Sequence, residues 1–280
     1  MKPLKKSTFA LVALLAVCCC SVGLRTPNAS ADAAEAEPKR YYDDYSAAAP
    51  ASTGSETFTY SRVVEERITF PNAVPYYSYD SSLPNACGPI AGAIIVGYYD
   101  KYVETLMPNF TAYYTATGNY KFGDSTHIPA LINDLYTRMR TNVDDVGVSE
   151  YDCVNGLNAY VYAQGESISY VPVKVNSFDE TAYKTAMNDG RPVLMFCNSI
   201  SIYGLTVETS QTEIYHIQTG SSHIAVGYGY RKLTYYNANN VNFRTDTYLE
   251  VATGWSTNMF GYVKLSDTSW LDSAYAIEIY

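Results

Sequence analysis

A cysteine stands directly before a run of small and apolar residues that is typical of a helix. The string Asn85-Ala-Cys87-Gly-Pro89 leads into Ile90-Ala-Gly-Ala-Ile-Ile, and proline is preferred in the first helical turn, so Cys87 falls at or just before a helix N-terminus. The amide N–H groups and the dipole of a helix N-terminus stabilise an anion and lower the pKa of a thiol. The pattern therefore indicates a reactive thiolate, with a capping or core cysteine as the alternative.

A thiolate nucleophile needs a base, and the chain contains three histidines. His223 opens the strand-like run Ser222-His-Ile-Ala-Val-Gly-Tyr and follows Cys87 by 136 residues, within the ~130 to 150 residues that separate Cys and His in papain-type peptidases. His216 precedes a loop-like Ile-Gln-Thr-Gly, and His127 begins a predicted helix, where a neutral polar residue is a common structural choice. We predict that His223 is the base and keep His216 and His127 as alternatives.

Four strings, taken together and in order, resemble the papain-like cysteine peptidases of bacteria. They are Ala86-Cys-Gly-Pro-Ile-Ala-Gly-Ala-Ile-Ile-Val-Gly-Tyr-Tyr-Asp, Leu106-Met-Pro-Asn, Gly220-Ser-Ser-His-Ile-Ala-Val-Gly-Tyr and Gly254-Trp255. The group that they resemble includes the peptidase domain that cleaves bacteriocin leaders (the double-glycine type), with streptopain as a more distant relative. The resemblance runs from about Glu65 to the C-terminus. It implies an α+β, papain-like fold in which N-terminal helices pack against a C-terminal antiparallel β-sheet.

The resemblance also implies roles for individual residues. Cys87 would attack the substrate and form a thioester, while His223 would take the thiol proton and later deliver it to the leaving amine. The oxyanion would be met by the Cys87 backbone N–H and one side-chain donor upstream. That donor is often a Gln six residues before the Cys, where this chain has Ser81. Asn85 is the amide within reach, and a turn or N-cap residue is its alternative reading.

The third catalytic position departs from the pattern of the family. Relatives carry Asn or Asp just before the Gly-Trp pair, where this chain has Ala252 and Thr253. The Thr253 side chain could accept one hydrogen bond from the imidazole, and Asp246, near the start of that strand, is a possible substitute or a turn residue. Trp255 would shield the Cys–His pair from water, with plain core packing as the alternative. A misoriented base can cost about 10⁴ in kcat.

The elements that must position these residues fall into two parts. Hydrophobic spacing predicts helices and then strands, which is an α+β arrangement with a cleft where the two layers meet. We expect the cleft walls in residues 110–126 and 199–220. The predicted helices are 87–105, 128–140, 150–164 and 179–188, and the predicted strands are 167–175, 192–198, 222–236, 245–251, 260–265 and 274–279, after an extended segment at 66–79.

The chain begins with the pattern of an export signal. Residues 1–31 hold three early lysines, an apolar run from Phe9 to Cys20 and an Ala29-Ser-Ala31 cleavage site, so we expect cleavage after Ala31 and a secreted product. A lipid on Cys18, Cys19 or Cys20 is a weaker alternative, because Val17 stands where lipoprotein signals carry a small residue.

Residues 32–57 are polar and rich in Ala, Glu and Ser, and we interpret them as a flexible linker, with a short pro-segment as the alternative. Residues 58–280 would form one domain large enough for a real core. No run after Ala31 approaches the ~20 apolar residues that span a bilayer, so we expect no membrane insertion after signal cleavage.

The composition of the chain argues against some classes of binding partner. Of 19 Lys plus Arg residues, four lie in the leader, so the mature chain has 15 basic and 28 acidic residues and a net charge of −13. Such a chain is repelled by nucleic acid and anionic lipid. The sequence offers no motif for a metal or a cofactor. Cys153 and Cys197 lie among apolar residues and are interpreted as packing residues. The oligomeric state has no sequence signal.

We therefore expect a secreted bacterial cysteine peptidase (a thiol protease, that is, a hydrolase) that acts on peptide or protein substrates through Cys87 and His223. Two alternatives stay open. One is a catalytically silent papain-like domain that acts as an extracellular binding module, suggested by the absence of Asn or Asp at Ala252 and Thr253. The other is a cysteine transferase or cell-wall amidase on the same fold, because the Cys and His chemistry is shared.

Overall fold

The computed structural model describes residues 41–42, 54–70, 74–75, 77–78, 82–266 and 268–280. These belong to one compact unit, Lys39–Tyr280. The expected leader 1–31 and most of the expected linker 32–57 lie outside the described residues. Helices pack beside a large antiparallel sheet, which confirms the predicted α+β class.

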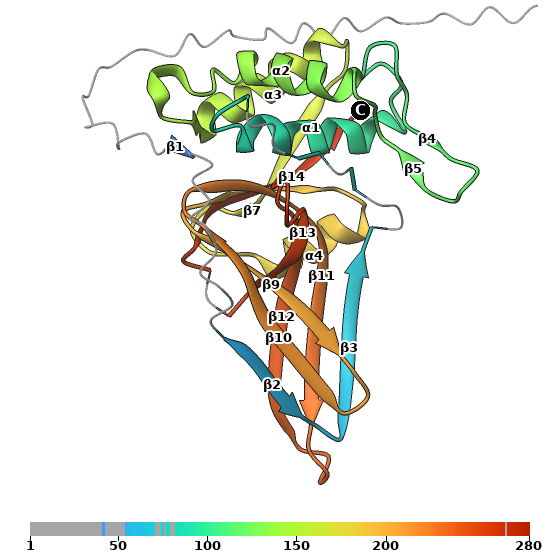
Figure 1. Cartoon of the computed structure of the whole chain (residues 1–280), viewed down its shortest axis with the longest axis vertical. Helices are drawn as coiled ribbons and strands as arrows, with labels where there is room; N and C mark the ends of the chain where they lie inside the picture. The colour runs from blue at the N-terminus through green and yellow to red at the C-terminus, as the bar shows by residue number, and fades with distance from the viewer. Residues whose placement is uncertain (1–40, 43–53, 71–73, 76, 79–81, 267) are drawn as a thin grey trace, which may run out of the picture. The chain divides into compact units, whose positions relative to one another are not determined.

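Helices form where the apolar spacing predicts them. Within the described ranges they are α1 (Cys87–Asp100), α2 (His127–Arg138), α3 (Glu150–Ala163), α4 (Glu180–Asn188) and the short 3₁₀ helix η1 (Val143–Asp145). Helix α1 is buried along its whole length and packs against α2, α3 and strand β11 (His223–Tyr236) (Figure 1). It ends five residues before the predicted Thr105, because the Asp100 carboxylate accepts the N–H groups of Met107 and Ala112 and folds the chain back.

The main sheet has ten strands in the order β2-β10-β9-β13-β12-β11-β8-β14-β7, with β3 paired to β11, and all of its pairings are antiparallel. Strand β11 is its centre: one edge pairs with β12, and the other pairs first with β8 and then with β3. The strands are β2 (Ser55–Thr59), β3 (Arg62–Thr69), β7 (Ile168–Lys174), β8 (Val193–Cys197), β9 (Ile200–Val207), β10 (Gln211–Gly220), β11 (His223–Tyr236), β12 (Asn242–Ala252), β13 (Phe260–Lys264) and β14 (Leu271–Ile279).

Several strands lie where the sequence predicted loops or linker. The expected cleft wall 199–220 is the hairpin of β9 and β10, and 110–126 contains a small hairpin of β4 (Tyr113–Tyr114) and β5 (Tyr120–Lys121). Strand β2 begins inside the expected linker. So does β1 (Tyr41–Tyr42), which pairs with β6 (Val148–Ser149). These segments have weak apolar alternation, and their partners supply the hydrogen bonds that order them.

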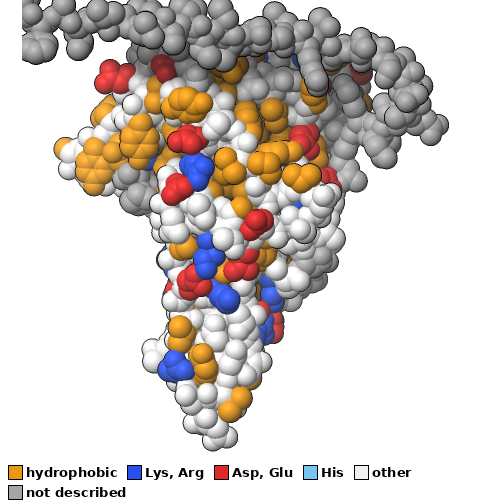
Figure 2. All heavy atoms as spheres, turned by 180° about the vertical axis from the view of Figure 1, so that it is seen from behind, with side chains coloured by type: hydrophobic (Ala, Val, Ile, Leu, Met, Phe, Trp, Pro, Cys, Tyr) orange, Lys and Arg blue, Asp and Glu red, His pale blue; other side chains and the backbone are white. Residues whose placement is uncertain are grey.

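The core lies between the helices and the sheet. A second, smaller cluster of buried residues lies on the sheet and consists of Tyr60, Ile214, Leu233, Tyr235 and Tyr248. In Figure 2, basic and acidic side chains lie beside one another on the surface shown, and three ion pairs join β3 to its neighbours: Arg67–Glu250, Glu65–Arg231 and Glu66–Lys184. In the part of the chain that the structure describes, no helix has the length and apolar character needed to cross a membrane.

Candidate active site

Cys87 is the first residue of α1 and is 2% exposed. The residue before it, Ala86, has no polar side chain, so the helix begins without a side-chain cap, and its first turn contains no acidic residue. The first amide N–H groups of a helix have no partner within the helix, and they point at whatever lies in front of it. The thiol therefore lies at the positive end of an uncapped helix, as the sequence predicted.

His223 is the first residue of β11 and is also 2% exposed. Its Nε2 lies 2.7 Å from the backbone carbonyl oxygen of Thr253, in the turn that follows β12. The indole of Trp255 covers the imidazole, with ring centroids 4.6 Å apart and planes inclined by 33°. Gly220 lies against that indole, since a Cβ built there would be 2.8 Å from a Trp255 ring carbon. The imidazole is thus held by a hydrogen bond and by contact with a tilted indole ring.

Two glycine contacts define how α1 meets the strands that carry His223 and Thr253. A Cβ built on Gly88 would lie 3.5 Å from Ile224 Cδ1, so the residue after Cys87 faces the residue after His223. A Cβ built on Gly254 would lie 2.8 Å from Ile90 Cγ2, so the next part of the same helical turn lies against the residue after Thr253. The first turn of α1 therefore packs on the start of β11, which carries the imidazole, and on the turn after β12, which carries its partner.

The third position is occupied by a main-chain oxygen. The Thr253 hydroxyl donates to the carbonyl of Asn258, 2.6 Å away, and accepts the N–H of Trp255, so it stabilises the turn and does not contact the imidazole. Gly254 follows with φ +76°, a conformation that favours glycine. Because the Thr253 carbonyl can only accept, this bond assigns the proton of a neutral imidazole to Nε2 and leaves Nδ1 as the basic nitrogen.

Asp246, the other residue considered for orienting the base, lies elsewhere. It pairs in register with Leu233, ten residues along β11 from His223, which corresponds to about 33 Å of strand. Its carboxylate is buried and pairs with Arg244 at 2.5 Å and Lys264 at 3.1 Å. Asp246 therefore does not orient the imidazole; it belongs to an ion cluster on the distal part of the sheet.

The structure gives Asn85 a role in a turn. Its backbone is left-handed, with φ +58°, and its side-chain amide donates to the side-chain oxygen of Asn142, which is also left-handed at φ +59°. This bond ties the segment before α1 to the loop after α2 and uses one of the two amide protons of Asn85. Ser81, six residues before Cys87, lies outside the described residues.

The two alternative histidines have other partners. His127 begins α2, and its Nδ1 lies 2.8 Å from Oδ1 of Asp124. The N–H groups of His127 and Thr126 also donate to that carboxylate, and these bonds lower the pKa of Asp124 to about 2. His216 lies on β10, where its Nε2 is 2.7 Å from the hydroxyl of Thr219. Both histidines therefore have local partners on or next to their own elements.

The remaining cysteines match the packing roles predicted for them. Cys153 and Cys197 are fully buried, and burial raises the pKa of both thiols well above the usual range, so both stay protonated at neutral pH. Cys87, Cys153 and Cys197 form no disulfide with one another. Among the residues that the structure describes, no group of His, Cys, Asp and Glu has an arrangement that would hold a metal ion.

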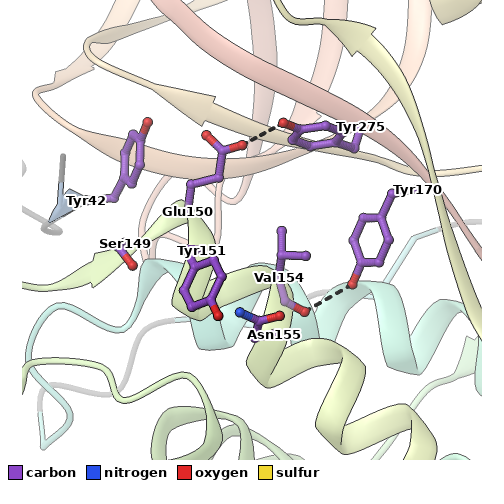
Figure 3. Close-up of a pocket in the computed structure, with 8 residues that line it drawn as sticks. All are labelled: Tyr42, Ser149, Glu150, Tyr151, Val154, Asn155, Tyr170 and Tyr275. Atoms are coloured by element: carbon purple, nitrogen blue, oxygen red, sulfur yellow. Dashed lines mark hydrogen bonds between the residues drawn. The ribbon is translucent and has the colours of Figure 1, made fainter. Parts of the chain in front are cut away.

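Tyr42 is a residue of this site that the sequence analysis missed. The Cys87 thiol donates to the Tyr42 backbone carbonyl, with Sγ 3.8 Å from the oxygen, and Tyr42 is 2% exposed. Beside it lies a pocket of about 530 Å³ (Figure 3). The pocket is lined by Tyr42, Ser149, Glu150, Tyr151, Val154, Asn155, Tyr170 and Tyr275. Tyr42 falls in a polar segment without periodicity, so no pattern could have found it.

Comparisons with models of protein families, with curated proteins and with solved structures found no match.

Proposed function

We propose that this protein is a secreted cysteine peptidase of papain-like architecture that hydrolyses peptide bonds through a thioester on Cys87. In this architecture a cysteine at a helix N-terminus faces a histidine on an antiparallel sheet. One observation carries the proposal: the first turn of α1 packs on the start of β11 and on the turn after β12, where a buried imidazole has its Nε2 hydrogen-bonded to a main-chain carbonyl. The four sequence strings that resemble the bacterial papain-like peptidases lie in these same elements.

In the proposed reaction, Nδ1 of His223 accepts the Cys87 proton, and the thiolate attacks the carbonyl carbon of the substrate. The N-terminus of α1 stabilises the oxyanion through its amide groups. The imidazolium then protonates the leaving amine, and the C–N bond breaks to leave a thioester. Water attacks the thioester, His223 takes the proton of that water, and the carboxylate product leaves. Throughout, the Thr253 carbonyl keeps the imidazole in one orientation.

The test is the pH dependence of alkylation by iodoacetamide on the folded, reduced exported chain, residues 32–280, with each cysteine quantified by peptide mass spectrometry. We expect Cys87 to react far faster than Cys153 and Cys197 at pH 6, and His223→Ala to abolish that advantage, because the thiolate then loses its imidazolium partner. Hydrolysis of denatured casein by the wild-type chain, with Cys87→Ala as the matched control, tests the reaction itself. A Cys87 that reacts like an ordinary thiol, with a pKa near 8.5, contradicts the proposal.

The alternatives predict different outcomes of the same experiments. A binding module on this fold would show neither a hyperreactive Cys87 nor casein hydrolysis. A transferase or an amidase would show the reactive thiol without casein hydrolysis. The acyl group would come from a donor other than casein, or it would pass to an acceptor other than water.

A further inference from the structure

The segment Tyr41–Tyr42 lies in the site as a short strand. It pairs antiparallel with β6, with Tyr41 opposite Ser149 and Tyr42 opposite Val148. Val148 in turn faces α1, since its Cγ1 would be 2.7 Å from a Cβ built on Gly88. An extended peptide that adds a strand to an exposed edge is a recurring mode of peptide recognition, because main-chain bonds hold the peptide and pockets read its side chains.

The carbonyl of this segment lies at the nucleophile. The Tyr42 carbonyl oxygen is 3.8 Å from Cys87 Sγ, and the carbon that a thiolate would attack is bonded to that oxygen. In a near-attack arrangement the sulfur lies about 3 to 3.5 Å from the carbonyl carbon, so attack requires Sγ to move from its hydrogen bond with the oxygen towards that carbon. Tyr42 thus occupies the place of the substrate residue that supplies the scissile carbonyl.

The Tyr42 side chain fills a pocket that suits a tyrosine. Its ring lies against Phe196, with centroids 5.3 Å apart, and its hydroxyl donates to the Asp272 carboxylate at 3.1 Å. Asp272 is held in place by Asn198, whose amide donates to the other carboxylate oxygen at 3.0 Å. The aromatic wall binds any large ring, and the partly buried carboxylate adds a partner for a phenolic hydroxyl.

The pocket formed by Phe196 and Asp272 lies next to the row of the sheet that contains His223. His223 pairs in register with Cys197 on β8, and Cys197 pairs with Leu271 on β14, so Phe196 and Asp272 each lie one residue from that row. Beyond Tyr42, the 530 Å³ pocket continues along α3 and gives room for a further substrate side chain (Figure 3).

We propose that the pocket formed by Phe196 and Asp272 selects tyrosine at the residue that supplies the scissile carbonyl, and that the chain's own bond after Tyr42 is such a substrate. The inference rests on the proposed peptidase function. Cys87 attacks the Tyr42 carbonyl carbon, the bond to the Asp43 nitrogen breaks, and His223 protonates the new amine of Asp43. Water then cleaves the thioester and leaves a Tyr42 carboxylate and the regenerated thiol.

The experiment follows the N-terminus of the exported chain, residues 32–280, by intact-mass spectrometry. We expect a product that begins at Asp43 and a released peptide that ends at Tyr42, at a rate that does not change over a twenty-fold range of protein concentration, as an intramolecular reaction requires. Cys87→Ala should stay intact. Tyr42→Phe should slow the cleavage about 3- to 10-fold, and Tyr42→Ala about 100-fold, because the hydroxyl and then the ring contacts are lost.

Controls separate recognition from folding. Tyr280→Ala removes a tyrosine that is 64% exposed at the end of β14 and should cleave at the wild-type rate. Asp272→Asn should reduce the advantage of Tyr42 over Tyr42→Phe, which a general loss of stability would not do. Thermal unfolding of each variant shows that it is folded at the temperature of the assay.

Two results would overturn the inference, and they can be told apart. If Cys87 is hyperreactive and casein is hydrolysed, but the bond after Tyr42 stays intact or Tyr42→Ala cleaves as fast as wild type, the pocket has been misassigned while the peptidase function stands. If Cys87 is unreactive and casein stays intact, the proposed function fails and the inference fails with it.

Discussion

At the scale of single residues, the imidazole of His223 is held by an oxygen that no substitution can delete. The Thr253 carbonyl accepts a hydrogen bond from Nε2, while the Thr253 hydroxyl donates a hydrogen bond within the turn. A side-chain orienter is lost with its residue, but a carbonyl persists as long as the turn keeps its path. The chain has no Asn or Asp directly before Gly254, yet the imidazole has a hydrogen-bond partner there, because that partner is a main-chain oxygen.

We therefore expect Thr253→Ala to be mild. The variant keeps the carbonyl and loses the two bonds of the hydroxyl, so kcat/KM for a peptide substrate should fall about 3- to 10-fold. His223→Ala should lose about 10³-fold or more, because the base itself is gone. Steady-state kinetics on both variants, with thermal unfolding as the folding control, makes the comparison. A loss in Thr253→Ala as large as that in His223→Ala would show that the side chain orients the base after all.

Asp100 should make stability depend on pH. Burial raises the pKa of its carboxyl to about 6, although the N–H groups of Ala112 and Met107 lower it in part. The folded state then binds more protons than the unfolded state between about pH 4 and pH 6. The titration of Asp100 should therefore lower the free energy of unfolding by up to about 3 kcal/mol as the pH rises through that window.

The measurement is urea unfolding at pH 4, 5, 6 and 7, for wild type and Asp100→Asn. The free energy of unfolding of wild type, minus that of the variant, should fall as the pH rises and then level off above pH 6. A difference that stays constant, or that rises with pH, would mean that the two backbone donors hold the carboxylate ionised.

At the scale of elements, the site depends on how closely the first turn of α1 approaches the turn after β12. Gly254 has φ +76°, and a Cβ there would come within 2.8 Å of Ile90. Gly165 offers a matched control, because it has φ +88° and nothing within 4 Å of a Cβ. The two glycines share the backbone requirement and differ in the contact.

Gly254→Ala should destabilise the protein by about 2 to 4 kcal/mol, because strain at positive φ adds to a clash. Gly165→Ala should cost about 1 to 2 kcal/mol from the backbone alone. The Gly254 variant should also lose more than about 10-fold in kcat, since the carbonyl of Thr253 moves with the turn. Urea midpoints and kcat measure both effects. Equal stability losses in the two variants would show that the contact with Ile90 has no energetic weight.

Elements with strong apolar spacing of their own could be predicted from the sequence, whereas elements that are ordered by distant partners could not. Helix α3 and strand β11 carry apolar spacing strong enough to read directly, and both begin within one residue of prediction. The β9–β10 hairpin is mixed in polarity and was expected as a loop, since its order comes from pairing with distant strands. Cys87 and His223 were predicted from helix chemistry and spacing. The Thr253 carbonyl and the strand at Tyr42 could not be predicted, because main-chain contacts do not depend on the type of the side chain.

At the scale of the whole sheet, the candidate site and a cluster of ion pairs lie on different parts of the same strands. His223 and Ala252 lie at the ends of β11 and β12 that meet α1, whereas Asp246, Arg244 and Lys264 form an ion cluster farther along. Glu56 of β2 joins that cluster through Arg244, and this ion pair lowers the pKa of Glu56 and raises that of Arg244.

Asp246→Ala should therefore destabilise the protein without changing the chemistry. Removing one member of a buried ion cluster leaves uncompensated charge, so we expect a loss of about 2 to 4 kcal/mol in the free energy of unfolding with kcat unchanged. Asp189→Ala, which removes an exposed partner of Arg191, should cost less than about 1 kcal/mol. Urea unfolding and kcat at a temperature where both variants are folded give the comparison. A large fall in kcat for Asp246→Ala would place Asp246 back among the residues that orient the base.

The distance between His223 and the far end of β11 also provides a place to attach a label. The strand runs from His223 to Tyr236, and the hairpin beyond it turns through Asn240 at φ +58°, with exposed residues around the turn. Thirteen residues of strand place that turn about 40 Å from the imidazole. A fluorophore, a biotin or a short tag inserted between Asn239 and Asn240 should therefore allow the protein to be anchored to a surface or followed in single molecules, with the candidate site far from the point of attachment.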